Sequence, residues 1–430
     1  MSFIIKNLEK AEQIPTRNGF GQGLVEAASA DERIVALSAD LVESTRTLDF
    51  KKKFPDRFIE MGVAEQNLAT VAAGLSAGGK IPVITSYAMF SPGRNWEQIR
   101  TTIAYNDRHV IIAGAHAGIS VGPDGATHQA VEDIAIMRVM PNMTVLVPCD
   151  ANETRKALIA AARYGKPVYL RFAREKTAVF TQQNAPFEIG KAQVFREGDD
   201  AAIIACGPMV YEALLAAEFL KKQHKLDIRV VNCPSIKPLD HRTIRETAEK
   251  CGCIVTVEEH QQFGGLGSAV AEYLSQSYPV PMFIMGIADR FGESGQPDEL
   301  LTKFGLKSRN IVSKVLELLR KKWPDSIPMA TEMHHEVRNV IGNVKPHEYF
   351  KTVNGGVIRN LPELKEALET MSESTFRHHV TNKKNDFGDW IRGVFKDDVL
   401  AHLVSRHNSK QEMAEVVHMR VKHAERRLGW

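Results

Sequence analysis

The chain has 430 residues, of which 43% are hydrophobic and 25% charged, with 30 glycines and 19 prolines. This composition excludes a disordered, a collagen-like or a disulfide-stabilised chain, and at about 150 residues per domain the length predicts roughly three domains. The 55 lysines and arginines exceed the 52 aspartates and glutamates by three, so net charge gives no reason to expect nucleic acid or an anionic membrane as a partner.

The cysteines and the N-terminus indicate where the protein works. The five cysteines form no C-x-x-C pair, which is typical of a chain kept in a reducing compartment. The first residues, MSFIIKNLEK, do not have the pattern of a secretory signal, and no stretch approaches 18 consecutive apolar residues. We therefore expect a cytoplasmic protein. The cysteines are Cys149, Cys206, Cys233, Cys251 and Cys253.

Residues 1–189 are predicted to form a doubly wound α/β domain. From about residue 17, short β-branched runs alternate with longer helical stretches, as in parallel sheets with right-handed crossovers. The strands are apolar on both faces, which a sheet covered by helices on each side requires. The predicted strands are Ile34–Leu37, Pro82–Thr85, Val110–Ala113, Thr144–Val147 and Val168–Arg171, and the helices are Gln66–Ala77, Trp96–Ala104 and Asn152–Arg163.

A second alternating set follows the polar stretch 187–200, so residues 190–322 are predicted to form a second, mainly parallel α/β domain. Its predicted strands are Ala201–Cys206, Ile228–Val231, Cys253–Val257 and Met282–Met285, and its helices are Val210–Lys222, Asp240–Lys250 and Ser268–Ser275.

Residues 326–430 differ from both. Nine of the 15 histidines lie here, the strand alternation stops, and helical periods such as Leu361–Met371 and Lys410–Leu428 dominate. Adjacent histidines point to different faces of a helix or strand, so His378 and His379 are poorly placed to bind one metal. The same holds for the pair 334–335. Zinc is the less favoured interpretation, and an appended helix-rich module for protein contact, resembling a small accessory domain of unknown function, is preferred.

The most informative segment is the glycine-rich stretch 114–133, GAHAGISVGPDGATHQAVED, which follows a predicted strand. It carries His116, Asp124 and His128 among four glycines. Glycines let the backbone approach a ligand closely, while imidazoles and a carboxylate at a strand end can hold hydroxyls and relay protons. A purely structural loop needs neither histidine. The segment therefore predicts a polar binding site.

Several motifs, in order and spread over about residues 10–320, resemble the transketolase family, specifically the C-terminal half of that enzyme, which some organisms make as a separate chain. The motifs are Thr16-Arg17, SADLVEST (38–45), MGVAEQN (61–67), the loop His116–Gln129, RFAR ending at Arg174, and VEEHQQFGGLGSAVAE (257–272).

The resemblance implies thiamine diphosphate chemistry, in which a two-carbon ketol unit moves from a ketose phosphate to an aldose phosphate. Glu65 matches the glutamate that hydrogen-bonds the aminopyrimidine ring, although a first-turn helical glutamate is also favoured by the helix dipole alone. Phe90 and Trp96 stand where relatives place aromatics around that ring, and either one could also be an ordinary core residue. Asp40 matches a residue near the thiamine.

The same resemblance implies a substrate site. His128 and Asp124 should meet sugar hydroxyls near the reacting carbons, as catalytic residues beside Glu65. Pro123 is a departure, because many relatives have a glutamate there, and it removes a carboxylate and an N–H and so bears on sugar preference. The distal phosphate should be met by His116, Arg17, Ser44 and Arg174.

One family element is not found in this sequence. In the family, a Gly-Asp-Gly segment followed 25 to 30 residues later by Asn holds Mg²⁺ and the diphosphate. The resemblance therefore implies a separate N-terminal, diphosphate-binding subunit, a hetero-oligomer with a self-pairing core, and no activity for this chain alone.

Alternative interpretations remain for one glycine-rich motif and for the chain as a whole. The run 264–272, GGLGSAVAE, could be a phosphate loop, but close helix–strand packing is the preferred interpretation, with His260 as a structural or interface residue. For the whole chain, the alternatives are a deoxyxylulose-phosphate synthase, a 2-oxoacid dehydrogenase beta subunit, or a noncatalytic scaffold. His116 disfavours the synthase and the DGATHQ pattern disfavours the beta subunit, whereas a scaffold would need neither Glu65 nor the loop residues.

Overall fold

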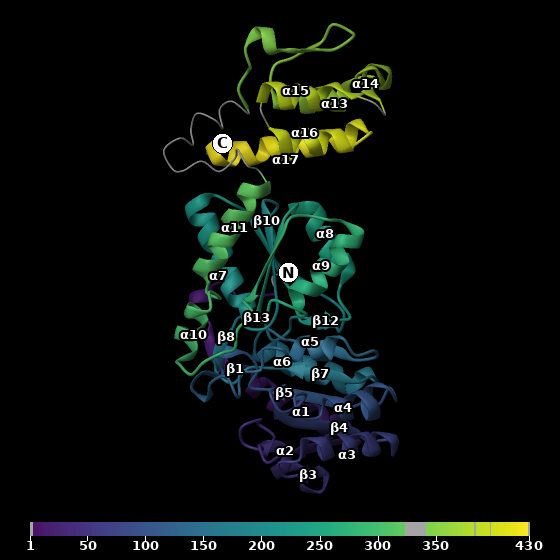
Figure 1. Ribbon diagram of the computed structural model, residues 1–430, viewed down its shortest axis with the longest axis vertical. Helices are drawn as coiled ribbons and strands as arrows, with labels where there is room; N and C mark the ends of the chain where they lie inside the picture. The colour runs from purple at the N-terminus through teal and green to yellow at the C-terminus, as the bar shows by residue number, and fades with distance from the viewer. Residues whose placement is uncertain (1–2, 323–340, 382–383, 396, 429–430) are drawn as a thin grey trace. The chain divides into compact units, whose positions relative to one another are not determined.

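The computed structural model describes residues 3–322, 341–381, 384–395 and 397–428. The chain divides into two compact units, with the boundary between Val315 and Leu316. The first unit holds a seven-stranded and a five-stranded sheet with their helices, and the second is mostly helical (Figure 1). The predicted fold class, two α/β domains followed by a helix-rich module, is confirmed. Within the described ranges, the structure contains no helix long and apolar enough to cross a membrane.

The first sheet has the order β12-β6-β7-β5-β4-β2-β3, and all its neighbouring strands are parallel except β12 and β6. Its strands are β2 (Ile34–Ser38), β3 (Phe58–Glu60), β4 (Ile81–Tyr87), β5 (Ile111–Ala115), β6 (Thr144–Leu146), β7 (Val168–Arg171) and β12 (Ser235–Lys237). Its helices are α1 (Thr16–Ala30), α2 (Leu48–Lys53), α3 (Glu65–Ala77), α4 (Trp96–Gln98), α5 (Asp133–Arg138) and α6 (Ala151–Tyr164).

Alternate residues of each strand enter two different cores. Ile34 and Ala36 of β2 pack with α1 and α6, whereas Val35 and Leu37 pack on the opposite face, with α3. This is the double burial that the apolar strands predicted, because successive side chains of a strand point to opposite faces. The core on the α3 face continues into the second domain, so the two α/β domains share buried apolar surface.

The second sheet has the order β14-β13-β10-β11-β9, parallel except for the edge strand β9. Figure 1 shows α8 and α9 on one face of this sheet and α7 and α11 on the other. Its strands are β9 (Gln193–Arg196), β10 (Ala201–Ala205), β11 (Ile228–Asn232), β13 (Ile254–Gln261) and β14 (Met282–Ile287), and its helices are α7 (Met209–His224), α8 (His241–Cys251), α9 (Leu266–Ser277), α10 (Pro297–Lys303) and α11 (Ser308–Lys322).

The structure departs from the predicted elements at one helix and five strands. The helix predicted over Trp96–Ala104 is a short α-helix, α4, that continues as a π-helical segment, Ile99–Ala104. The strands β3, β9 and β12 and the antiparallel pair of β1 (Glu12–Pro15) with β8 (Lys176–Val179) were not predicted, because each has only three or four residues and mixes polar with apolar side chains. All five cysteines are buried and none forms a disulfide.

The second unit has a core of its own, built from leucines of one helix, phenylalanines of two others and the inner face of the last helix. Its described elements are β15 (Phe350–Lys351), β16 (Val357–Ile358), α13 (Leu361–Thr370), α14 (Glu373–His379), β17 (Val380–Thr381), β18 (Lys384–Asn385), α15 (Asp386–Trp390), α16 (Asp398–Arg406) and α17 (Lys410–Leu428), with a π-helical segment at Ile391–Phe395.

Of the two pairs of adjacent histidines predicted in this region, one lies within the described residues. His379 is buried, with Nδ1 at 3.0 Å from Asp386 and Nε2 accepting the Val353 N–H, whereas His378 is exposed. Both ring nitrogens of His379 are thus engaged within the protein. His334 and His335 lie outside the described residues. Among the residues that are described, no group of three or more His, Cys, Asp or Glu is arranged to hold a metal.

Candidate functional site

The predicted site residues gather at the carboxyl edge of the first sheet. Asp40 lies two residues after β2, Glu65 begins the helix after β3, His116 directly follows β5, and Arg174 follows β7. Because the carboxyl ends of parallel strands open at one edge, residues far apart in the sequence come together there. The topology thus places these separate motifs at one edge of the sheet.

Glu65 is the first residue of α3 and its side chain is buried, with 4% exposure. Its carboxylate accepts one long hydrogen bond, 3.5 Å, from Ser86 Oγ, while Asn95 Nδ2 donates to its backbone carbonyl at 3.0 Å. Asn95 Oδ1 is also buried, and in the described part of the chain it has no hydrogen-bond partner. Buried polar groups with weak partners are costly, so this spot is built for a polar ligand.

Aromatic and imidazole rings form a cluster at the end of β4, next to Ser86, the hydrogen-bond partner of Glu65. Tyr87, the last residue of β4, stacks on His116 with ring centroids 4.1 Å apart, and Phe90 lies 6.1 Å from Tyr87. His128 meets the edge of Phe90 at 5.4 Å. The sequence interpretation missed Tyr87; the available signal was its position at the end of a buried strand, within TSYAMF.

His116 lies in a strongly cationic pocket. It is 1% exposed, its Nδ1 has no partner among the described residues, and its backbone has a left-handed φ of 56°. Burial, followed by the positive charges of Arg17 and Arg174, lowers the pKa of His116 to about 3. The imidazole is therefore neutral at physiological pH, and it can donate or accept one hydrogen bond without adding charge.

The arginines of this pocket are held by neighbouring loops. Arg17, in the first turn of α1, donates to the backbone carbonyl of Ser44 at 3.1 Å, so the structure brings the Ser44 main chain into the pocket. Arg17 Nε is buried and has no partner in the described residues. Arg174 forms an ion pair with Asp124 at 3.0 Å, which joins the glycine-rich loop to the segment after β7. Two guanidiniums thus lie near one imidazole, a combination of groups suited to an anion.

Comparison with known proteins agrees with this arrangement. Residues 12–179 match the family model of the transketolase pyrimidine binding domain, and residues 190–311 match that of the transketolase C-terminal domain. The chain belongs to the transketolase family. It is a C-terminal subunit of a split transketolase, an enzyme that depends on thiamine diphosphate.

Three relatives illustrate the similarity. A 6-deoxy-6-sulfo-D-fructose transketolase subunit of a Clostridium species is 41% identical, over 73% of this chain and 97% of that protein. A subunit of the apulose-4-phosphate transketolase of Phocaeicola vulgatus is 39% identical, over 72% of this chain and 98% of that protein. A solved structure, an inactive β4 tetramer of a split-gene transketolase, is 45% identical with a TM-score of 0.66, over 72% of this chain and 99% of that one.

Two predicted cofactor residues of this transketolase subunit occupy unlike surroundings. Asp40 has a left-handed φ of 59°, and its N–H donates to Glu60 Oε1 at 2.8 Å. Trp96 packs against the apolar core, and its Nε1 donates to the carbonyl of Ile136 at 2.9 Å. Glu60 was missed from the sequence, although it shapes both the Asp40 turn and, through Gly62 N–H at 3.2 Å, the approach to Glu65.

The glycine motif at the start of α9 is not a phosphate loop in this transketolase. The carboxylate of Glu258 accepts the N–H groups of Leu266 and Gly267, both at 2.8 Å, so the positive end of the helix is already neutralised. A Cβ on Gly267 would lie 2.4 Å from Ile284, which supports the packing interpretation. His260 is fully buried and accepts the Ala135 N–H at 3.3 Å, so its contacts are structural.

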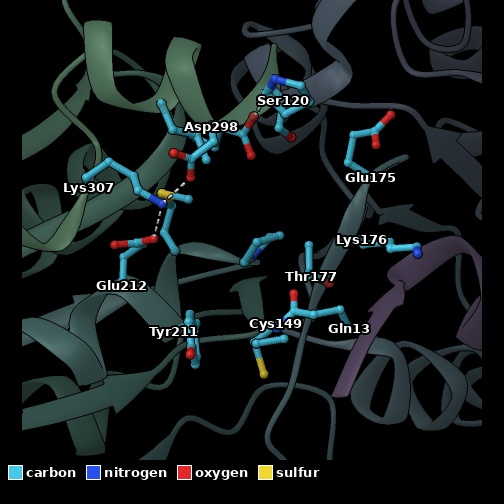
Figure 2. A pocket seen from close by; sticks show the side chains of 16 residues that line it. Gln13, Ser120, Cys149, Glu175, Lys176, Thr177, Tyr211, Glu212, Asp298 and Lys307 are labelled. Carbon is cyan, nitrogen blue, oxygen red and sulfur yellow. Dashed lines mark hydrogen bonds and ion pairs between the residues drawn. The ribbon is translucent and has the colours of Figure 1, made fainter. Parts of the chain in front are cut away.

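A cavity of about 200 Å³ lies between the two α/β domains (Figure 2). Ser120 of the glycine-rich loop and Glu175, the neighbour of Arg174, contribute to its lining. Across the cavity, Lys307 pairs with Glu212 and with Asp298, each at 2.7 Å. None of the ten predicted site residues lines this space, so the candidate site is the sheet edge and not the enclosed cavity.

Proposed function

We propose that this subunit binds the aminopyrimidine end of thiamine diphosphate and a sugar phosphate, while a separate N-terminal subunit binds the diphosphate and Mg²⁺. Together they transfer a two-carbon ketol unit from a ketose phosphate to an aldose phosphate. The observation that carries this proposal is the pairing of a buried, weakly partnered Glu65 with a pocket whose buried donors, on Arg17 and His116, lack partners in the described chain.

The cofactor roles follow from the residues present. Glu65 would hold a ring nitrogen by a hydrogen bond, which burial of the carboxylate strengthens. Tyr87 and Phe90 would pack against the flat ring, and Asp40 and Trp96 would border it as their motif positions suggest. When bound, thiamine diphosphate supplies an electron sink for the carbon–carbon bond that breaks. The poorly satisfied groups at Glu65 and Asn95 fit such a ligand.

The substrate roles divide between two ends of a sugar. His128 and Asp124 hold hydroxyls near the reacting carbons, and His128 moves a proton there. His116, Arg17, Ser44 and Arg174 hold the terminal phosphate, with the arginines supplying charge and the neutral His116 supplying a hydrogen bond. Many relatives have a glutamate where this chain has Pro123, so a carboxylate is missing at that sugar position. We expect the contact with the sugar to be less polar there.

The other parts of the proposal concern the metal, the assembly and the cellular compartment. We assign Mg²⁺ to the partner subunit because the Gly-Asp-Gly segment with its later Asn, which holds the metal and the diphosphate in the family, is not found in this sequence. The 45% identical relative, described as an inactive β4 tetramer, supports a self-pairing core that lacks activity without its partner. Val63, beside Glu65, exposes 70% of its surface, as an interface residue would. Five buried cysteines that form no disulfide agree with the cytoplasm as the working compartment.

Reconstitution tests this proposal. The purified chain, supplied with thiamine diphosphate, Mg²⁺, xylulose 5-phosphate and ribose 5-phosphate, should give no turnover. Adding the diphosphate-binding subunit encoded by the same genome should start ketol transfer. Turnover by the chain alone, or no turnover by the mixture although sizing shows a complex, would contradict the division of the cofactor between two polypeptides.

Glu65→Ala tests the cofactor assignment within that complex. We expect a loss of about 10²-fold or more in kcat, with assembly unchanged, because proton movement on the ring loses its partner. Glu32→Ala removes an exposed carboxylate at the other edge of the sheet and serves as the matched control. Turnover preserved in Glu65→Ala would remove this residue from the mechanism.

A further inference from the structure

A third arginine, Arg46, borders the pocket around His116 and belongs to none of the motifs that predicted the site. It lies after β2 with a left-handed φ of 62°. Its Nε donates to Asn18 Oδ1 at 3.0 Å, which orients the guanidinium and leaves its two terminal nitrogens available. Gly21 of α1 packs closely under this turn, since a Cβ there would lie 2.6 Å from the Arg46 carbonyl oxygen. The turn and the side chain are thus both held.

The charge of Arg46 acts on the same pocket as the predicted residues. It lowers the pKa of Arg17, where it is the largest influence after burial, and it also contributes to the lowered pKa of His116. The contacts agree with this: Arg46 is bonded to Asn18, the neighbour of Arg17, and it follows by two residues Ser44, whose carbonyl accepts from Arg17. Three guanidiniums therefore act on one neutral imidazole.

The three guanidiniums differ in whether a carboxylate balances their positive charge. Arg174 is paired with Asp124 at 3.0 Å and with Glu175 at 3.3 Å. Arg17 and Arg46, in contrast, contact a backbone carbonyl and a neutral amide, and within the described residues neither has a carboxylate partner. Glu175 acts on Arg17 from a distance, but no ion pair within the described residues offsets either charge, which leaves both arginines able to pair with an anion from outside.

We propose that Arg46 is a specificity-determining residue that recognises the second negative charge of the sugar's terminal phosphate, so that the site prefers a dianionic phosphate to a monoanionic sulfonate or a neutral end. This rests on the proposed function and specifies its substrate class. Two uncompensated guanidiniums match a charge of −2, and arginine's planar fork suits phosphate oxygens. A phosphate monoester carries this charge above its second pKa, about 6.

The test compares variants in the reconstituted complex. Arg46→Leu removes charge and fork, and Arg46→Lys keeps the charge alone. Arg163→Leu is the control: this exposed arginine lies in the last turn of α6, just before β7, at the opposite edge of the sheet. The measurements are kcat/KM for ribose 5-phosphate and for unphosphorylated ribose as acceptors, and inhibition by inorganic phosphate and by methanesulfonate.

We expect Arg46→Leu to lower kcat/KM for ribose 5-phosphate about tenfold or more and to leave that for ribose within about twofold, as loss of a charge-assisted hydrogen bond predicts. Arg46→Lys should have a kcat/KM for ribose 5-phosphate between that of Arg46→Leu and that of the unmodified enzyme. Inhibition by phosphate should weaken more than inhibition by methanesulfonate, and Arg163→Leu should match the unmodified enzyme. Equal losses for both acceptors, or no loss for either, would overturn the proposal.

Binding of inorganic phosphate to the isolated chain tests the role of Arg46 independently of the proposed function. If the mixture of subunits gives no ketol transfer, the proposed function fails, but calorimetry at pH 7.5 still decides the role of Arg46. Weaker phosphate binding by Arg46→Leu than by Arg163→Leu supports it. Equal binding by the two variants, or no phosphate binding by the unmodified chain, refutes it.

Discussion

His116 has both a strained backbone conformation and a pKa far below its usual value. A non-glycine residue with a φ of 56° is held at an energetic cost that its surroundings must offset, and such residues concentrate at functional sites. Because the pKa of His116 falls from 6.5 to about 3, the unfolded chain binds a proton between these pH values that the folded chain does not. This residue therefore makes folding less favourable as the pH falls from about 6.5 towards 3.

Removing a neighbouring charge should move this titration. In Arg17→Leu the pKa of His116 should rise, because Arg17 is the largest influence on it after burial. Histidine-selective ¹³C NMR across pH 4 to 8 would follow the ring, and in the unmodified chain the His116 signal should stay constant over that range. A His116 signal that titrates near 6.5 in the unmodified chain would contradict a neutral imidazole, and Arg163→Leu should change nothing.

At the level of elements, the start of α9 shows how a glycine motif can serve packing. Glu258 lies on β13 and caps the helix that follows it, and its burial raises the pKa of this carboxyl although the helix N–H groups favour its charge. Gly267 then lets α9 lie against β14, within reach of Ile284. The motif thus fixes a helix on a sheet and leaves no free anion site.

A pair of glycine-to-alanine changes tests this packing. In Gly267→Ala the new Cβ would overlap Ile284 and Thr256, and we expect a loss of about 1–3 kcal/mol in the free energy of unfolding. In Gly74→Ala, inside α3, the Cβ meets nothing within 4 Å, so alanine should stabilise by about 0.5–1 kcal/mol through helix propensity. Urea unfolding measures both, and similar effects at the two positions would argue against the packing role.

The sequence predicted regular elements better than it predicted contacts. Every predicted strand of the two sheets is present, because runs buried on both faces leave an unambiguous pattern. Tyr87 and Arg46 escaped prediction for a physical reason: their importance comes from residues that only the crossover topology brings beside them, namely His116 and Arg17. Local periodicity also cannot reveal that α4 continues as a π-helical segment.

At the level of the whole molecule, one buried carboxylate joins the first two domains. Glu153 of α6 accepts from the Cys149 N–H and from Asn232 Nδ2 of β11, both at 2.7 Å. Burial is the main cause that raises its pKa to about 7. Between pH 4.5 and 7 the folded chain therefore holds a proton that the unfolded chain releases, and stability falls as the pH rises through this window.

Glu153→Gln should remove that dependence. The amide can keep the Cys149 contact, and its NH₂ can donate to Asn232 Oδ1, which is buried without a partner in the described residues, once the Asn232 amide turns over. Relative to the unmodified chain, the variant should gain up to about 3 kcal/mol in the free energy of unfolding between pH 5 and 8. Denaturant melts at several pH values measure the difference, in which the His116 contribution cancels. A constant difference would contradict the raised pKa.

The second unit has its own apolar core; the Clostridium and Phocaeicola relatives align almost in full over 313 and 309 residues, and the matched family domains end at residue 311. We therefore expect a chain ending at residue 325 to assemble with the diphosphate-binding subunit and to keep kcat within about twofold. Size-exclusion chromatography and the ketol-transfer assay would measure both properties. A loss of turnover in an intact truncated complex would give residues 326–430 a part in catalysis.

The left-handed backbone at Asp40, Arg46 and His116 also limits how this enzyme could be re-engineered. Mutant libraries at these positions should leave out β-branched residues, which accept such a conformation least, and should include glycine, asparagine and aspartate beside unbranched side chains like those of the native Arg46 and His116. A change of sugar preference is thus better sought at Pro123, whose backbone carries no such restriction and whose side chain faces solvent.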